Sequence, residues 1–190
     1  MGEEWAVGWL EVRKVPCIGE DGGMVFELDV TLNPEVAPLA WLVGSWRGLG
    51  VVGYPGMESC NMVQEVEITH DGRPFLTMNS RSWELDEEGK QVRPLATETG
   101  YWRVVGDGEI ELLLAHPTGI VEMFVGKKEK ERPVIEMATD GVMRSPAARE
   151  YNSAKRMYGL VDSKLMWVLE MAADGHPMTS HMSAQLERVA

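Results

Sequence analysis

The sequence predicts an all-β protein, built as an antiparallel up-and-down β-barrel of about ten strands. Glycine and proline recur at short intervals along the chain and separate runs rich in Val, Ile, Leu, Thr, Trp and Tyr. The turns between these runs have the length of hairpin connections, which favours a meander over Greek-key crossings. No long helical pattern competes with this reading.

The individual strands follow from these runs. We expect them near residues 45–54, 61–69, 75–85, 95–105, 109–115, 119–125, 133–139, 147–160, 164–173 and 178–188. Tight turns are expected at 71–72, 87–90, 106–108, 161–164 and 173–175, where Gly, Asp and Ser cluster. Residues 147–160 could also be helical by composition, but strand is preferred.

A short helical turn is expected within residues 33–44, just before the first barrel strand, because Pro34 and Pro38 suit helix starts. The length of 190 residues suits one domain, which we place at residues 36–190. Residues 1–35 then form an N-terminal extension with one possible strand at 24–32. Trp5 and Trp9 in this extension cover either a barrel surface or a partner.

Composition excludes several classes of function. The net charge is −12 without a basic cluster, so nucleic acid and anionic membranes are poor partners. No apolar run approaches the roughly 20 residues needed to cross a membrane, and the first residues lack a signal-peptide pattern. A cytoplasmic location and two free thiols, Cys17 and Cys60, are therefore expected.

One motif marks the start of the barrel. "GSWRGLG" at residues 44–50 contains Gly44, Trp46, Gly48 and Gly50 in a GxWxGxG pattern. We expect Trp46 to plug one end of the barrel, while the glycines permit a sharp entry and strong bending of the strand.

Further segments extend this motif into a family resemblance. They are "YP" at 54–55, "GRPFL" at 72–76, "ETGYWRV" at 98–104, "ELLLAHPTGIVEMFVG" at 111–126 and "LEMAADGHPMTSHMSAQLER" at 169–188. Together they resemble the nitrobindin family of haem-binding β-barrels, from about residue 38 to 188. The resemblance implies a ten-stranded barrel similar in shape to fatty-acid-binding proteins, with one haem b per chain.

The resemblance also implies a ligand and an activity. Nitrobindins hold ferric iron through a single histidine near the chain end, and this position falls on His181 in "HMSAQL". They bind nitric oxide and convert peroxynitrite to nitrate, so a haem-dependent peroxynitrite isomerase is implied. Strand alternation alone places His181 on the face of Ser183, Gln185 and Glu187, which suggests exposure to solvent.

The other three histidines are expected to have ordinary roles. His176 lies in a "DGHP" turn and should be exposed, and His70 lies in a turn where a local hydrogen bond is expected. His116 precedes a proline and should fix its turn through a backbone hydrogen bond. None of the three is expected to fill the second axial position on the iron, and no protein general acid or base is evident.

One stretch departs from the family pattern. Gly56 stands where nitrobindins usually have threonine after "YP", and Cys60 and Met62 stand where aromatic residues are usual. We expect the haem pocket to be formed, besides His181, by Gly56, Met57, Met78 and Met171, since methionine adapts to irregular apolar space. These methionines could equally fill core.

Two alternatives remain open at this stage. The barrel could carry a fatty acid or another small apolar ligand without catalysis, or it could be a relative that binds no haem. The expected partners are the small molecules peroxynitrite and nitric oxide, and the chain is expected to be a monomer or a homodimer.

Overall fold

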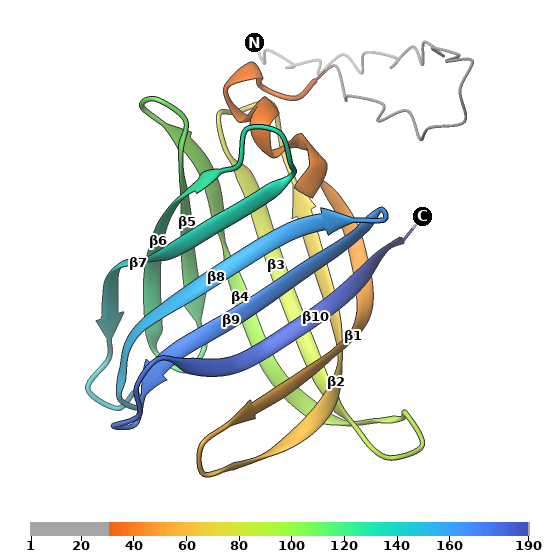
Figure 1. Ribbon diagram of the computed structural model, residues 1–190, viewed down its shortest axis with the longest axis vertical. Coiled ribbons are helices and arrows are strands. Elements are labelled where there is room, and N and C mark those ends of the chain that lie inside the picture. Colours follow the sequence, from red (N-terminus) through yellow and green to blue (C-terminus); the bar gives the residue numbers. More distant parts are fainter. Residues whose placement is uncertain (1–30, 190) are drawn as a thin grey trace, which may run out of the picture.

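Ten antiparallel strands close into one barrel in the computed structural model, which describes residues 31–189 (Figure 1). Each strand pairs with its neighbours along the chain, and β1 closes the ring by pairing with β10. The strands are β1 (Gly44–Tyr54), β2 (Met57–Thr69), β3 (Leu76–Leu85), β4 (Gln91–Val105), β5 (Glu109–His116), β6 (Ile120–Lys128), β7 (Val134–Arg144), β8 (Tyr151–Val161), β9 (Lys164–Ala173) and β10 (Thr179–Val189). The predicted fold class is confirmed.

Five of the ten strands differ from expectation by three residues or more at one end. β2 begins at Met57 rather than 61, β4 begins at Gln91 rather than 95, and β6 ends at Lys128 rather than 125. β7 runs on to Arg144, well past its expected end at 139, and its paired register with β8 stops at Ala138 and Lys155. β8 begins at Tyr151 rather than 147, because the chain turns at Ser145, whose carbonyl accepts the N–H of Ala148. The helical alternative for 147–160 is therefore wrong.

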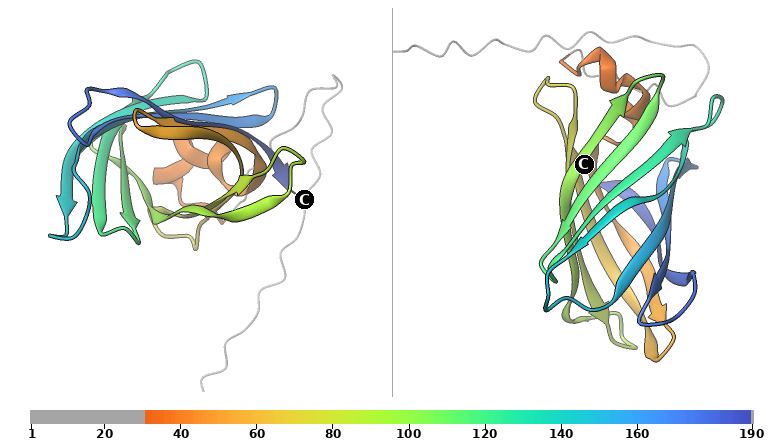
Figure 2. Two further views of the ribbon diagram at one scale, coloured as in Figure 1. Left: turned by 90° about the horizontal axis from the view of Figure 1, so that it is seen from below. Right: turned by 90° about the vertical axis from the view of Figure 1, so that its left-hand side faces the viewer.

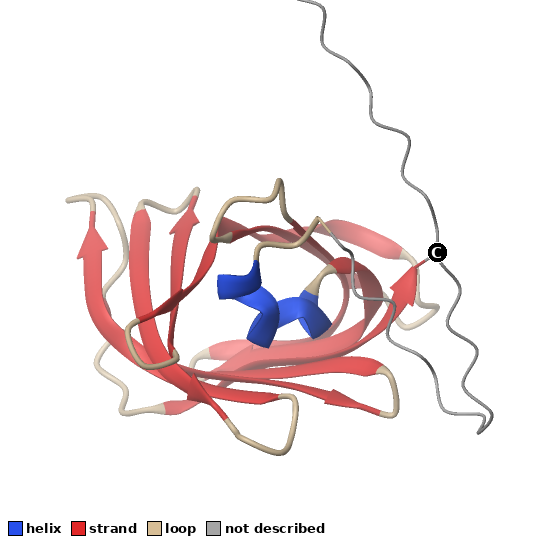
Figure 3. Cartoon of the chain, turned by 90° about the horizontal axis from the view of Figure 1, so that it is seen from above, coloured by secondary structure: helices blue, strands red, loops and turns tan. Residues whose placement is uncertain are grey.

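A 3₁₀-helix, η1 (Pro34–Leu42), lies over one end of the barrel (Figures 2 and 3). Asn33 caps it by accepting the N–H of Glu35 at 3.0 Å, and a proline occupies its first turn. Its buried side chains join the core: Val36, Leu39, Trp41 and Leu42. The expected boundary at 35/36 falls inside this helix. The expected strand at 24–32 lies mostly outside the described residues, as do Trp5, Trp9 and Cys17.

Within residues 31–189, no helix is both long enough and apolar enough to cross a membrane.

The GxWxGxG motif joins this helix to the barrel. Trp46 is buried, its indole N–H donates to the carbonyl of Leu42 at 2.8 Å, and the Arg188 guanidinium covers its ring at 4.1 Å. A Cβ on Gly48 would lie 2.1 Å from the carbonyl oxygen of Gln185 in β10. Trp46 thus packs into the core next to η1, and Gly48 lets β1 approach β10 closely, a role that was not predicted for it.

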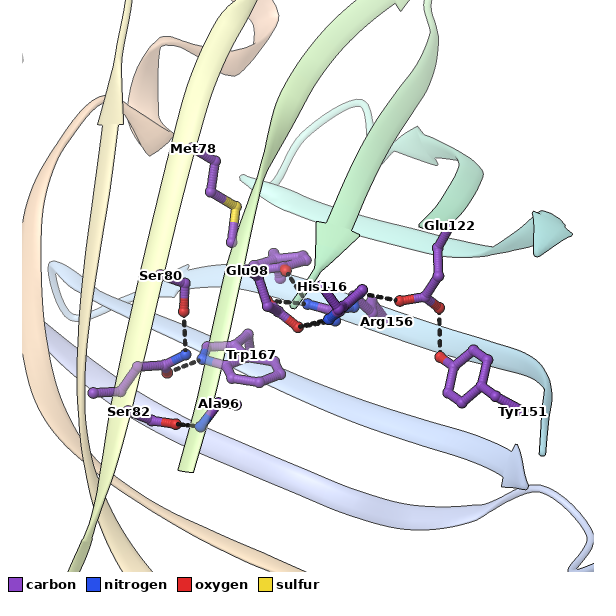
Figure 4. Close-up of polar contacts among 12 residues, drawn as sticks. Met78, Ser80, Ser82, Ala96, Glu98, His116, Glu122, Tyr151, Arg156 and Trp167 are labelled. Atoms are coloured by element: carbon purple, nitrogen blue, oxygen red, sulfur yellow. Dashed lines mark hydrogen bonds and ion pairs between the residues drawn. The ribbon is translucent and has the colours of Figure 1, made fainter. Parts of the chain in front are cut away.

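The inside of the barrel is not wholly apolar. Its buried polar and charged side chains are Gln64, Ser80, Ser82, Glu98, Glu122 and Arg156. Gln64 accepts from the indole N–H of Trp167 at 2.8 Å and donates to Ser80 at 2.9 Å, so this part of the interior is satisfied internally (Figure 4).

Candidate functional site

A cavity of about 690 Å³ opens into the barrel, within the range of small-molecule pockets. Its lining comes from the β1–β2 turn, the starts of β6 and β8, and the interior faces of β4, β9 and β10. These segments are far apart in sequence, and only closure of the barrel brings them together.

His181 lines this cavity because β10 is irregular at that position. Ser180 pairs with Glu170 of β9 and Met182 pairs with Leu169, so His181 is an extra residue without its own partner. Such a β-bulge changes the direction of a side chain and interrupts the alternation of faces. His181 and Met182 consequently both line the cavity, and the exposure that strict alternation suggests for His181 does not occur.

The imidazole of His181 is held in one orientation. Its Nδ1 lies 3.0 Å from the carbonyl oxygen of Gly53, and Tyr54 packs edge-on against its ring with centroids 5.6 Å apart. Since a carbonyl only accepts hydrogen bonds, Nδ1 carries the proton and Nε2 keeps its lone pair. Burial lowers the pKa of His181 below its usual 6.5, which favours the neutral ring.

Tyr54 fixes the β1 end of this arrangement. Its hydroxyl lies 3.2 Å from the carbonyl oxygens of Met171 and Ala173 and accepts the N–H of Ala173 at 2.9 Å. This joins β1 to β9 next to the histidine. The sequence analysis did not single out this tyrosine.

The other predicted pocket residues divide into two groups. Gly56, Met57 and Met171 line the cavity with His181. Met78 does not join them: it is buried in the core, where its sulfur accepts the indole N–H of Trp102 at 3.3 Å. Met62 is also a core residue, and burial raises the pKa of the partly buried Cys60 thiol, which disfavours a thiolate.

A charged cluster that the sequence analysis missed forms one wall of the cavity (Figure 4). Arg156 and Glu98 are both buried and are joined by two hydrogen bonds, one of them 3.1 Å long. Burial by itself would raise the pKa of Glu98 and is the largest single effect, but the charge of Arg156, its hydrogen bonds and the nearby histidines together lower the net pKa below the usual range. Burial likewise opposes the charge on Arg156, yet Glu98 holds its pKa well above normal.

His116 also belongs to this cluster, in addition to its expected role in the turn. Its carbonyl accepts the N–H of Gly119 and closes the turn, as expected, and its side chain contacts Glu122, with Nε2 and Oε2 2.7 Å apart. The hydroxyl of Tyr151 donates to the other oxygen of Glu122. The cavity therefore does carry acid–base groups, whereas none was evident from the sequence.

A sequence signal for this cluster exists. Glu98 alternates in phase with Trp102, Glu122 with Phe124, and Arg156 with Tyr158, and all six are buried. Charged residues on the inward face of a strand mark a partly polar barrel interior. Read in this way, the strand pattern alone would have pointed to them.

Comparison with known proteins agrees with this architecture. The family model described as "THAP4-like, heme-binding beta-barrel domain" matches residues 35–188. The crystal structure of Rv2717c from M. tuberculosis superimposes with a TM-score of 0.76 at 35% sequence identity, covering 84% of this chain and 99% of that one.

Curated relatives carry two different names. A "Ferric nitrobindin-like protein" of Streptomyces griseus is 46% identical over 165 residues, which is 87% of either chain. A "Peroxynitrite isomerase" of Salinispora tropica is 44% identical over 163 residues, covering 83% of this chain and 82% of the relative.

Proposed function

Because the chain belongs to the family of THAP4-like haem-binding β-barrels, the nitrobindins, we propose that its cavity binds one haem b through the Nε2 atom of His181. The observation that carries this proposal is the state of His181. Its Nδ1 is engaged by Gly53, its pKa is lowered, and its ring faces a cavity rather than solvent. A neutral imidazole with an oriented ring is what an iron ligand requires.

The rest of the cavity suits a flat apolar cofactor. Leu169, Met171 and Met182 provide apolar lining from β9 and β10, and Gly56 and Met57 lie at the β1–β2 turn. A Cβ at Gly56 would have no atom within 4 Å, so the missing threonine leaves open space there rather than a packed wall. Gly56 therefore does not obstruct the pocket, and Cys60 and Met62 do not line it.

We further propose that the loaded protein isomerises peroxynitrite to nitrate and binds nitric oxide. The ferric haem supplies the centre at which peroxynitrite rearranges. His181 would hold the iron through Nε2, and Leu169, Met171 and Met182 would provide apolar contacts to the cofactor. His116 lines the same cavity, but its Nε2 is occupied by Glu122, so we expect no second histidine ligand from the described residues.

A hemin titration tests the cofactor proposal. We expect one equivalent of hemin to produce an intense Soret band in the purified protein, and His181→Ala to shift or weaken that band. His176→Ala is the matched control, because this exposed histidine packs against Tyr54 at 5.8 Å but does not line the cavity. A wild-type protein without a specific band, or equal spectra for wild type and His181→Ala, would refute haem ligation by His181.

Peroxynitrite decay tests the activity separately. Stopped-flow absorbance should show faster decay with the haem-loaded protein than with the same concentration of free hemin, and nitrate should be the product. Equal decay rates would refute the isomerase while leaving haem binding intact. A cytoplasmic location and a monomeric or dimeric state stay predictions.

A further inference from the structure

Arg156 is a cation placed inside a cavity that is expected to hold an apolar ligand. Only 2% of its surface is exposed, and its Nε has no hydrogen-bond partner among residues 31–189. Its Nη1 donates to Tyr158 Oη at 3.1 Å and to Glu98 Oε2 at 3.1 Å, and Nη2 donates to Glu98 Oε1. The two terminal nitrogens of one guanidinium thus hold the two oxygens of one carboxylate, and the Tyr158 hydroxyl accepts from the same guanidinium.

Aromatic side chains also contact Arg156, in addition to Glu98. Its guanidinium carbon lies 5.2 Å from the ring centre of Phe124 and 5.6 Å from that of Trp167. Tyr158 in turn stacks on Trp167 and packs edge-on against Trp102. Cation–π and aromatic contacts of this kind help to position both groups.

We propose that the Arg156 guanidinium forms an oxyanion-binding site inside the barrel, which the carboxylate of Glu98 fills and thereby closes to carboxylate ligands such as fatty acids. Glu98 is tethered on β4, so it competes with a free carboxylate at a high effective concentration. A fatty acid that displaced it would take the guanidinium partner from the buried carboxylate of Glu98. That carboxylate would be left beside His116, whose Nδ1 lies 3.9 Å away and whose Nε2 already contacts the second buried carboxylate, Glu122. Glu98 is therefore a specificity-determining residue that excludes acidic lipids.

This inference concerns the haem-free barrel and does not rest on haem binding. It also distinguishes fatty acids from neutral apolar ligands. A fatty acid needs a cation to pair with its carboxylate, whereas a neutral apolar molecule does not. Loss of haem binding would leave the inference intact, and its own failure would leave the haem proposal intact.

The test compares decanoate with decanol by isothermal titration calorimetry on purified protein. The wild type should bind decanoate no more tightly than decanol. Glu98→Ala should bind decanoate at least about tenfold more tightly than the wild type does, while decanol affinity stays within roughly threefold. The added substitution Arg156→Met should abolish the gain.

Glu122→Ala is the matched control, since Glu122 is equally buried on the same wall but bonds His116 and Tyr151 instead of Arg156. An equal gain of decanoate affinity in this variant would overturn the proposal, as would no gain in Glu98→Ala.

A second experiment applies if Glu98→Ala is unfolded in chloride buffer. Refolding of this variant by sodium acetate at equal ionic strength, measured by near-ultraviolet circular dichroism, supports the proposal. If acetate does not refold Glu98→Ala and Glu98→Gln binds decanoate no more tightly than the wild type does, the proposal is overturned.

Discussion

The Nδ1 atom of His181 lies 3.0 Å from the carbonyl oxygen of Gly53, a residue 128 positions earlier in the chain. The contact crosses from β10 to β1, the pair of strands that closes the barrel. Closure of the fold therefore also sets the tautomer and orientation of the candidate iron ligand. A hydrogen bond from the remote ring nitrogen is how metal-binding histidines are commonly positioned.

The tautomer of His181 is the first prediction. In the haem-free protein at pH 7 we expect a neutral ring with its proton on Nδ1, because Gly53 accepts that proton and the pKa of His181 lies below 6.5. Long-range ¹H–¹⁵N nuclear magnetic resonance spectra distinguish the two tautomers, and His181→Ala assigns the signals. A ring protonated on Nε2 would contradict the proposed ligand geometry.

The second prediction concerns the Trp46 anchor. Trp46→Ala removes a side chain that is 1% exposed and its hydrogen bond to Leu42, so the free energy of unfolding should fall by about 3–5 kcal/mol. Leu49→Ala on the same strand is the control: Leu49 is 64% exposed, and a change within about 0.5 kcal/mol is expected. Urea unfolding measures both, and a similar loss in the two variants would count against the anchor.

The third prediction concerns the close approach of β1 and β10. Gly48→Ala would place a Cβ 2.1 Å from the carbonyl oxygen of Gln185 and 2.8 Å from the Cα of Leu186. The backbones must separate, and we expect a loss of stability of about 2 kcal/mol or more, as for other overpacking changes. Gly141→Ala in β7 is the control, because its Cβ would meet no atom within 4 Å. Thermal unfolding of the two variants checks this, and equal transition temperatures would refute it.

The fourth prediction is an acid limb of stability caused by Glu98. The pKa of Glu98 in the folded protein lies below its ordinary 4.5, despite the opposing effect of burial. Below pH 4.5 the unfolded chain therefore binds a proton at this residue before the folded chain does, and stability falls as the pH drops through the folded-state pKa.

Glu98→Gln removes this linkage. Its free energy of unfolding should be lower than that of the wild type at pH 7, but it should change less between pH 5 and the acid limit. Glu170→Gln, a change at an exposed carboxylate on β9, serves as the control. Chemical unfolding at a series of pH values gives the curves, and parallel wild-type and Glu98→Gln curves would contradict the prediction.

Local patterns along the chain were enough to predict the barrel. Hairpin turns and alternating apolar residues depend on neighbours in sequence, so the ten strands, the helical turn before β1 and the position of Trp46 could be read directly. The resemblance to nitrobindins, confirmed by the family model over residues 35–188, rests on motifs that are likewise local.

The positions of the site residues depend on strand irregularities and on contacts between strands, which the sequence pattern predicts poorly. Alternation assigned His181 to the outer face, and only the bulge between Ser180 and Met182 turns it inward. Met78 was expected at the pocket, yet it packs against Trp102 in the core. His116 closes its turn as expected, but its side chain also contacts Glu122 across the β5–β6 hairpin, which the turn pattern did not predict.

The sequence by itself thus determined a ten-stranded barrel, its tryptophan anchor and the histidine that a haem would require. Only the tertiary structure decided that this histidine faces a cavity and that Glu98 lies against Arg156, 58 residues away. The reason is physical. Turns and alternation are set by adjacent residues, whereas a bulge and an internal ion pair depend on the register of strands that meet only when the barrel closes.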